Sequence, residues 1–187
     1  MIVLAVFGIL MVAASSFLIQ VVQNGNRVAI ENEVRQNGQA VIGDIISRGR
    51  TASCVYFYQP PGGAAVLRLS NSVSGTGCNG GDRIEYQVDS TGVVTRKEIS
   101  QSGVVSGPVT ISSPSVAVLD CSGGVAACRG GSCVPGLAVS GNFDPVNHVL
   151  AGQTATVTLS LQQPPGVSRS DFCAAMTLVD SVTPRML

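Results

Sequence analysis

The sequence predicts an α+β protein: a long N-terminal α-helix, apolar in its first half and amphipathic in its second, packed on an antiparallel β-sheet head with disulfide-linked loops. Three observations predict it. Residues 1–22 carry no charged side chain, residues 23–50 repeat apolar side chains at helical spacing, and residues 51–187 alternate apolar and polar side chains in short segments. We therefore expect three regions with these boundaries, of which the first two form one helix and the third forms the head.

The length and composition of the first region predict a helix that can cross a membrane. Its only strongly polar side chains are Ser15, Ser16 and Gln20, and a helix of this length spans ~33 Å, the hydrocarbon thickness of a bilayer. It fits a secretory signal peptide, a membrane anchor, or an apolar helix with a second use. A signal peptide begins with positive charge, and no Lys or Arg precedes Arg27, so the other two interpretations are favoured.

The second region continues the helix. The spacings between its apolar residues are built from steps of three and four, as on one side of a helix. These residues form one narrow stripe: Val28, Val34, Val41, Ile42, Ile45 and Ile46. The opposite surface carries pairs of opposite charge four residues apart, including Arg27 with Glu31 and Asp44 with Arg48. The whole element is ~75 Å long. Such a helix suits a chain that packs one half against copies of itself while the other half carries a head.

The run from Met1 to Leu10 resembles the N-terminal segment of type IV pilins and of the pseudopilins of type II secretion. When the two are aligned on Gly8, Ile9 and Leu10, Met1 falls inside the family's motif, so the start of that motif is expected upstream of Met1. Residues 39–48, 51–53 and 82–88 resemble the helix end and first hairpin of J-type or W-type minor pilins.

The resemblance implies a pilin-like fold and a helix that lies in the inner membrane before assembly and in a filament core afterwards. The residues of this membrane and filament-core helix are Met1, Val3, Val6, Phe7, Gly8, Ile9, Leu10, Phe17 and Leu18. The implied partners are copies of the chain in a helical filament, other pilins and the assembly machinery.

The third region shows short segments rich in Val, Ile and Thr between Gly-, Ser- and Pro-rich loops, a pattern typical of antiparallel strands. A turn over residues 89–92 is expected to place Gly92 at positive φ. The nine expected strands are Cys54–Tyr58, Ala65–Ser70, Arg83–Val88, Gly92–Ile99, Val104–Ile111, Val116–Leu119, Leu137–Ser140, Thr154–Leu161 and Cys173–Val179.

All six cysteines lie in the head, and an even number in a domain carried across a membrane indicates disulfides in an oxidising compartment. A zinc site is disfavoured because no Cys-x-x-Cys spacing occurs. Six cysteines allow 15 connectivities. The preferred set is Cys54–Cys78, Cys121–Cys173 and Cys128–Cys133.

The composition excludes several classes of function. Eleven basic and eleven acidic residues give a net charge of zero and only 4% of residues are aromatic, so no specific nucleic-acid binding is expected. His148 is the only histidine, and its neighbours supply neither a catalytic triad nor a metal site. We expect it to be a solvated or hydrogen-bonded loop residue, and we expect no catalytic residues, no metal and no cofactor.

These observations favour a structural subunit of a type IV pilus-like extracellular filament. The subunit is expected to be anchored in the cell-envelope membrane before assembly and to polymerise through its N-terminal helix. The alternative is a single-span, membrane-anchored envelope protein that does not polymerise and whose disulfide-linked head binds a ligand.

Overall fold

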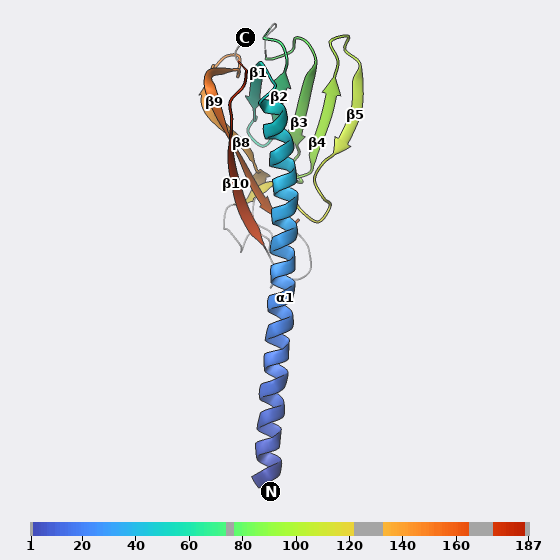
Figure 1. Cartoon of the computed structure of the whole chain (residues 1–187), viewed down its shortest axis with the longest axis vertical. Coiled ribbons are helices and arrows are strands. Elements are labelled where there is room, and N and C mark those ends of the chain that lie inside the picture. The colour runs from blue at the N-terminus through green and yellow to red at the C-terminus, as the bar shows by residue number, and fades with distance from the viewer. Residues whose placement is uncertain (1, 74–76, 122–132, 165–173, 186–187) are drawn as a thin grey trace.

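The computed structural model describes residues 2–73, 77–121, 133–164 and 174–185, with only the backbone described at residues 2–6 and 9. One helix, α1 (Ile2–Gly49), runs without interruption for 48 residues. Its C-terminal half lies against the β-strands and its N-terminal half extends away from them as a stalk (Figure 1). The head therefore covers only half of the helix.

The C-terminal half of α1 is held by the predicted apolar stripe. Val34 and Ile45 are each 1% exposed, and Val41, Ile42 and Ile46 are also buried. Val28, the first residue of that stripe, is exposed, and the fully buried core residues of α1 begin at Val34. The helix stops at a turn in which the Thr51 hydroxyl donates a hydrogen bond to the Arg48 carbonyl (2.9 Å), so one of the carbonyls left free at a helix end has a donor.

Five antiparallel strands follow α1 in sequence order and form one sheet, which runs from beside the upper end of α1 to the right of Figure 1. The Asp89 carboxylate accepts hydrogen bonds from the backbone N–H groups of Thr91 and Val93, and Gly92 takes φ 82°, as expected for this turn. The strands are β1 (Cys54–Tyr58), β2 (Ala65–Ser70), β3 (Arg83–Val88), β4 (Val94–Ile99) and β5 (Val105–Thr110).

Two further sheets complete the described part of the head. The three-stranded sheet has the order β10-β9-β8, formed by β8 (Leu137–Phe143), β9 (Leu150–Gln162) and β10 (Ala175–Val182). The two-stranded sheet pairs β6 (Leu119–Cys121) with β7 (Cys133–Pro135). The helix contacts β10 and β9.

One hydrophobic core joins the helix to both larger sheets. Ile45 of α1, Tyr86 and Leu67 of the five-stranded sheet, and Leu137 and Leu159 of the three-stranded sheet are all fully buried. Because apolar burial is the dominant favourable term in folding, the helix end and the two sheets form one cooperative unit rather than separate domains.

The predicted α+β class is wrong, because the protein is mostly β, with 42% strand against 27% helix. Sequence patterning gave β1, β2 and β3 with their observed bounds. It missed β7, and it placed a strand at 116–119 where β6 begins only at Leu119. The patterning did not show that the strands divide among three sheets, since that division depends on pairing between distant segments.

The glycine between β7 and β8 permits a close backbone approach. A Cβ atom added to Gly136 would overlap the Ser160 carbonyl oxygen and lie 2.8 Å from backbone atoms of Leu119. A Cβ atom on Gly43, on the exposed side of α1, would meet nothing within 4 Å.

We predict opposite effects for two Gly-to-Ala substitutions. Gly136→Ala should lower the melting temperature, since rigid backbone must move to relieve the overlap. Gly43→Ala should raise it by ~2–4 °C, because Ala stabilises a helix interior by about 1 kcal/mol relative to Gly. Thermal melts of both variants followed by circular dichroism measure this, and equal melting temperatures would contradict the described packing.

Candidate functional site: an exposed apolar helix half and its anchoring cluster

Residues 7–22 of α1, which we call the apolar half, expose many apolar side chains to solvent, and this exposure needs a functional explanation. Val12 is 68% and Phe17 66% exposed, and Leu10, Met11, Leu18, Ile19, Val21 and Val22 are exposed to a similar degree. Three consecutive residues point to three sides of a helix, so runs such as 10–12 and 17–19 expose apolar surface all around the helix. Soluble monomers rarely expose a contiguous apolar surface of this kind.

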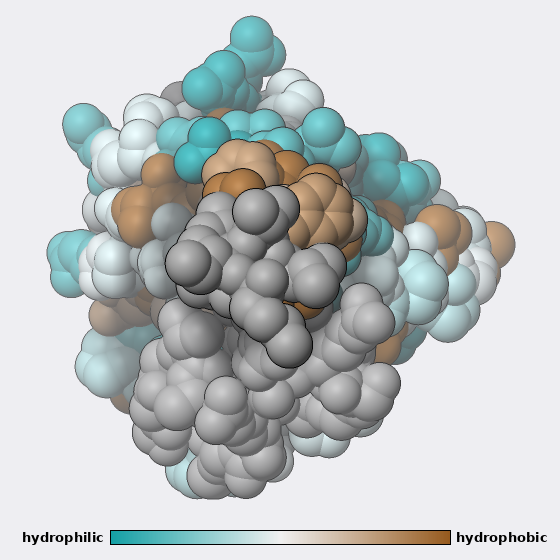
Figure 2. All heavy atoms as spheres, turned by 90° about the horizontal axis from the view of Figure 1, so that it is seen from below, coloured by the Kyte–Doolittle hydropathy of each residue, from teal (hydrophilic) through white to brown (hydrophobic). Residues whose placement is uncertain are grey.

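A view along α1 from its N-terminal end shows the same distribution. Hydrophobic atoms lie directly above the grey residues at the centre of the view, smaller hydrophobic areas lie at the left and right, and hydrophilic atoms dominate the upper edge (Figure 2). Exposed apolar side chains also occur on the head, for example Val104 and Val146, but the long run of them in sequence lies on the stalk.

The structure places four of the expected filament-core side chains on this surface. Phe7, Leu10, Phe17 and Leu18 are exposed on the stalk, and an added Cβ atom at Gly8 would meet nothing within 4 Å. The side chains of Met1, Val3, Val6 and Ile9 lie outside the described residues.

In the described part of the chain, no helix contains a stretch long and apolar enough to cross a membrane.

A polar group of five residues, the Asp44 cluster, fixes the other half of α1 to the five-stranded sheet: Asp44, Arg48, Tyr86, Arg96 and Glu98. The Tyr86 hydroxyl donates to the Asp44 carboxylate at 2.7 Å, Arg48 Nε donates to it at 3.0 Å, and one Arg96 nitrogen lies 3.2 Å from both carboxylate oxygens. Glu98 then pairs with Arg48 at 3.3 Å and with Arg96 at 3.4 Å. The cluster thus joins one helix turn to two neighbouring strands.

The cluster favours the ionised form of Asp44. Burial by itself raises the pKa of this carboxyl, but the hydrogen bonds from Tyr86, Arg48 and Arg96 outweigh burial and lower the pKa below its ordinary value. Burial, followed by the hydrogen bond to the Asp44 carboxylate, raises the pKa of Tyr86. The tyrosine therefore keeps its proton, and its hydroxyl donates a hydrogen bond to the carboxylate.

The spacing of Asp44 and Arg48 on one helix face was visible in the sequence, but the parts played by Tyr86 and Arg96 were not. These two residues lie 42 and 52 positions from Asp44 in the chain. One feature of the sequence could have indicated the role of Arg96. Side chains alternate between the two faces of a strand, so this charged residue lies on the same, covered face of β4 as Val94.

The structure contains two disulfides in its described residues. Cys54 bonds to Cys78, the expected partner, with Cα atoms 5.7 Å apart. Cys121 bonds to Cys133, so the expected Cys121–Cys173 and Cys128–Cys133 pairs are wrong. The reason is the register of β6 and β7, which places Cys121 directly opposite Cys133. Cys128 and Cys173 lie outside the described residues.

Disulfides form and persist in oxidising compartments. The two bonds therefore indicate an extracellular or periplasmic location for the head. Among the described residues, no three His, Cys, Asp or Glu side chains gather closely enough to bind a metal ion.

His148 lies in the loop between β8 and β9 and connects the two larger sheets. Its backbone N–H donates to the Asp144 carbonyl at 2.9 Å, and its carbonyl accepts from the N–H of Phe57 in β1 at 3.1 Å. Its ring lies 4.8 Å from the Tyr58 ring and 6.1 Å from the Tyr56 ring, between centroids. These contacts make it a hydrogen-bonded, half-buried loop residue with a packing role.

We predict that Asp44→Asn lowers the free energy of unfolding at pH 7 by about 1–3 kcal/mol, because two guanidinium groups lose their anionic acceptor. The loss should shrink at acid pH. A carboxyl whose pKa is lowered by folding contributes stability above its unfolded pKa of about 3.9, and this contribution disappears as pH falls through the folded value.

Urea unfolding of both proteins between pH 7 and pH 2 measures this effect. Tyr86→Phe, which removes one hydrogen bond and no charge, is the matched control and should cost less at pH 7. A constant difference between wild type and Asp44→Asn at every pH would show that the carboxylate does not carry the cluster.

The Cys54–Cys78 bond closes a loop with a sequence separation of 24. We predict that the double substitution of Cys54 and Cys78 by Ala lowers stability by about 3 kcal/mol, mainly because the unfolded chain gains freedom. At this chain length the loss corresponds to ~6–12 °C in melting temperature. A melting temperature within about 2 °C of wild type would contradict a stabilising crosslink.

No family model, no curated protein and no solved structure matches this chain. Any functional assignment therefore rests on the geometry of the apolar half and of the head.

Proposed function

We propose that the chain is the structural subunit of a type IV pilus-like extracellular filament that polymerises through α1. The observation that carries the proposal is the exposed apolar half, in which residues such as Val12 and Phe17 are about two-thirds exposed on a helix that continues into a folded head. Each apolar side chain transferred out of water contributes about 1.5–3 kcal/mol. A bundle of identical stalks gives all of them the same apolar surroundings.

The division of the helix supports an assembly in which heads lie outside and stalks inside. The core of the head uses α1 only from residue 34 onward among its fully buried side chains, so packing of the stalk requires no change in the head. The apolar half also contains no charged residue between Phe7 and Val22, which allows close packing of parallel copies without repulsion between like charges.

The fold of the head is compatible with this role. Two disulfides and a shared core hold it together, which suits a subunit that works outside the cell. The Asp44 cluster fixes the direction of α1 relative to the five-stranded sheet. In a filament this connection would transmit force between the stalk bundle and the heads.

The test is the assembly state of the full chain without detergent. We predict ordered filaments by negative-stain electron microscopy and fast-sedimenting material by centrifugation. Phe17→Lys and Leu18→Asp should abolish both, because an uncompensated charge in an apolar bundle is costly, while the melting temperature of the head stays unchanged.

Val146→Asp is the matched control. Val146 is 81% exposed on the head, so the same type of substitution there should leave filaments intact. Single, detergent-dependent particles from the wild-type chain would overturn the proposal and favour a non-polymerising envelope protein.

A further inference from the structure

A cleft of about 500 Å³ opens on the head beside the C-terminal end of α1. Its volume lies within the range of pockets that hold small organic ligands. The apolar half lies at the opposite end of α1 (Figure 1), so the cleft is separate from the surface that carries the proposed assembly.

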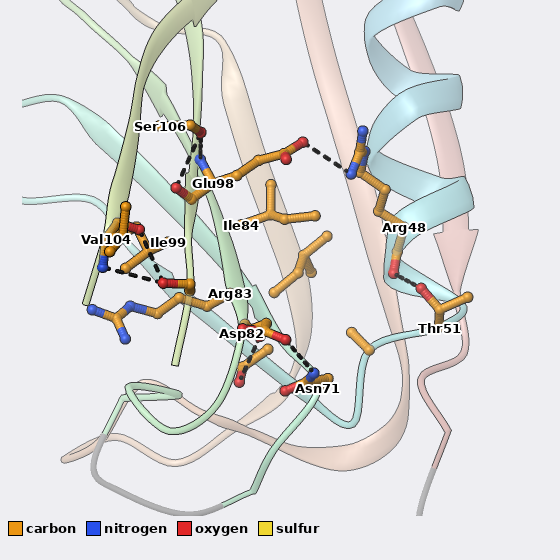
Figure 3. A pocket seen from close by; sticks show the side chains of 14 residues that line it. Arg48, Thr51, Asn71, Asp82, Arg83, Ile84, Glu98, Ile99, Val104 and Ser106 are labelled. Atoms are coloured by element: carbon orange, nitrogen blue, oxygen red, sulfur yellow. Dashed lines mark hydrogen bonds and ion pairs between the residues drawn. The ribbon is translucent and has the colours of Figure 1, made fainter. Parts of the chain in front are cut away.

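The cleft exists because α1 stops before it has covered the whole face of the five-stranded sheet. The helix lies over the row of paired residues in which Tyr86 and Arg96 bind Asp44, and it ends at Gly49. Two further rows, at the ends of β2, β3, β4 and β5, line the cleft beyond that end (Figure 3). The first row is Leu69, Ile84, Glu98 and Ser106, and the second is Asn71, Asp82, Ser100 and Val104.

The base of the cleft is apolar. Leu69 and Ala52 are buried there, and Ile84 is half-buried beside them. Val104 is 68% exposed at the outer edge and extends the apolar surface outward. An apolar group placed in the cleft would remove these side chains from water, which favours a ligand with a hydrocarbon body.

The polar end of the cleft is an ion pair. A terminal nitrogen of Arg48 lies 3.3 Å from a carboxylate oxygen of Glu98, as Figure 3 shows. Arg48 also pairs with Asp44, and Glu98 also pairs with Arg96, so the charges of these four residues cancel. This end therefore offers N–H donors beside a carboxylate acceptor, with no net charge. A primary amide, which carries one acceptor oxygen and N–H donors, is complementary to it.

The other charged residues of the lining do not call for a charged ligand. The Asp82 carboxylate accepts from the Gln101 backbone N–H at 2.8 Å and from the Asn71 side-chain amide at 3.5 Å, so each of its oxygens has a donor. Arg83 precedes Ile84 in β3, and its side chain therefore lies on the opposite face of the sheet and points away from the cleft (Figure 3). A charged ligand would lose its hydration here without gaining an unpaired counter-charge.

We propose that this cleft binds a small uncharged amphipathic ligand, an amide on a hydrocarbon body. The amide lies at the Arg48–Glu98 pair, where its carbonyl accepts from Arg48 and its N–H donates to Glu98. The hydrocarbon body packs against Ile84 and Leu69. A carboxylate in the same place is repelled by Glu98, and an ammonium group is repelled by Arg48.

Hexanamide titrated into the full chain and followed by ligand-observed NMR tests the proposal, with hexanoate and hexylammonium as probes of equal length. We expect hexanamide to bind at least about fivefold more tightly than either charged probe, because only the uncharged group enters the cleft without an uncompensated charge. Equal binding of all three probes would overturn the assignment, since contact with the hydrocarbon body alone would then explain it.

Glu98→Gln tests the role of the ion pair. It leaves the two arginines of the Asp44 cluster with one carboxylate, so the cleft gains positive charge and should bind hexanoate at least about threefold more tightly than the wild-type cleft does. Glu85→Gln is the matched control. Glu85 pairs with Arg68 at 2.8 Å on the opposite face of the same sheet, so this variant should keep the wild-type order of affinities. Equal changes in the two variants would contradict the proposal.

Two neighbouring valines test the location of the site without altering the ion pair. Val104→Glu adds an anion to the outer edge of the cleft and should raise the affinity for hexylammonium relative to that for hexanoate by at least about threefold. Val105 is also exposed but does not line the cleft, so Val105→Glu should leave this ratio unchanged. Because both side chains are exposed, neither substitution should lower the melting temperature. The same ratio in both variants would overturn the assignment.

N-acetylleucinamide distinguishes two sources of the same chemistry. Tighter binding of N-acetylleucinamide than of hexanamide would assign the amide to a peptide segment, and the reverse order would assign it to a free small amide. All of these titrations work on filaments and on single particles, so their results and the test of assembly are independent.

Discussion

The main constraint on this structure is that the head covers only the C-terminal half of α1. Residues from Val34 onward place an apolar stripe in the core of the head, whereas residues 7–22 expose apolar surface on every side. The chain thus buries the apolar side chains at one end of α1 in its own core and leaves those at the other end exposed to water, which is unfavourable. The assembly of copies that we propose would bury the exposed half without any change in the head.

The Asp44 cluster matters because the covered half of α1 needs a fixed orientation. Apolar packing is non-directional, so a helix that lies on two sheets can slide or rotate at modest cost. Hydrogen bonds from Tyr86, Arg48 and Arg96 to one carboxylate require one geometry. The cluster therefore sets where the stalk leaves the head.

Features that depend on local pattern could be predicted from the sequence, and features that depend on distant pairing could not. Alternating apolar and polar residues predicted β1, β2 and β3 with correct bounds. The apolar stripe that includes Val34 and Ile45 predicted the buried face of the helix. The partner of Cys121 follows from the register of β6 on β7, which no local pattern encodes.

Electron cryomicroscopy of the detergent-free assembly tests the central claim most directly. We expect a helical reconstruction in which the apolar halves of neighbouring copies pack at about 8–10 Å between helix axes around the filament axis, with the heads outside. A reconstruction that shows heads in contact and residues 7–22 exposed to solvent, or particles without helical order, would contradict the account.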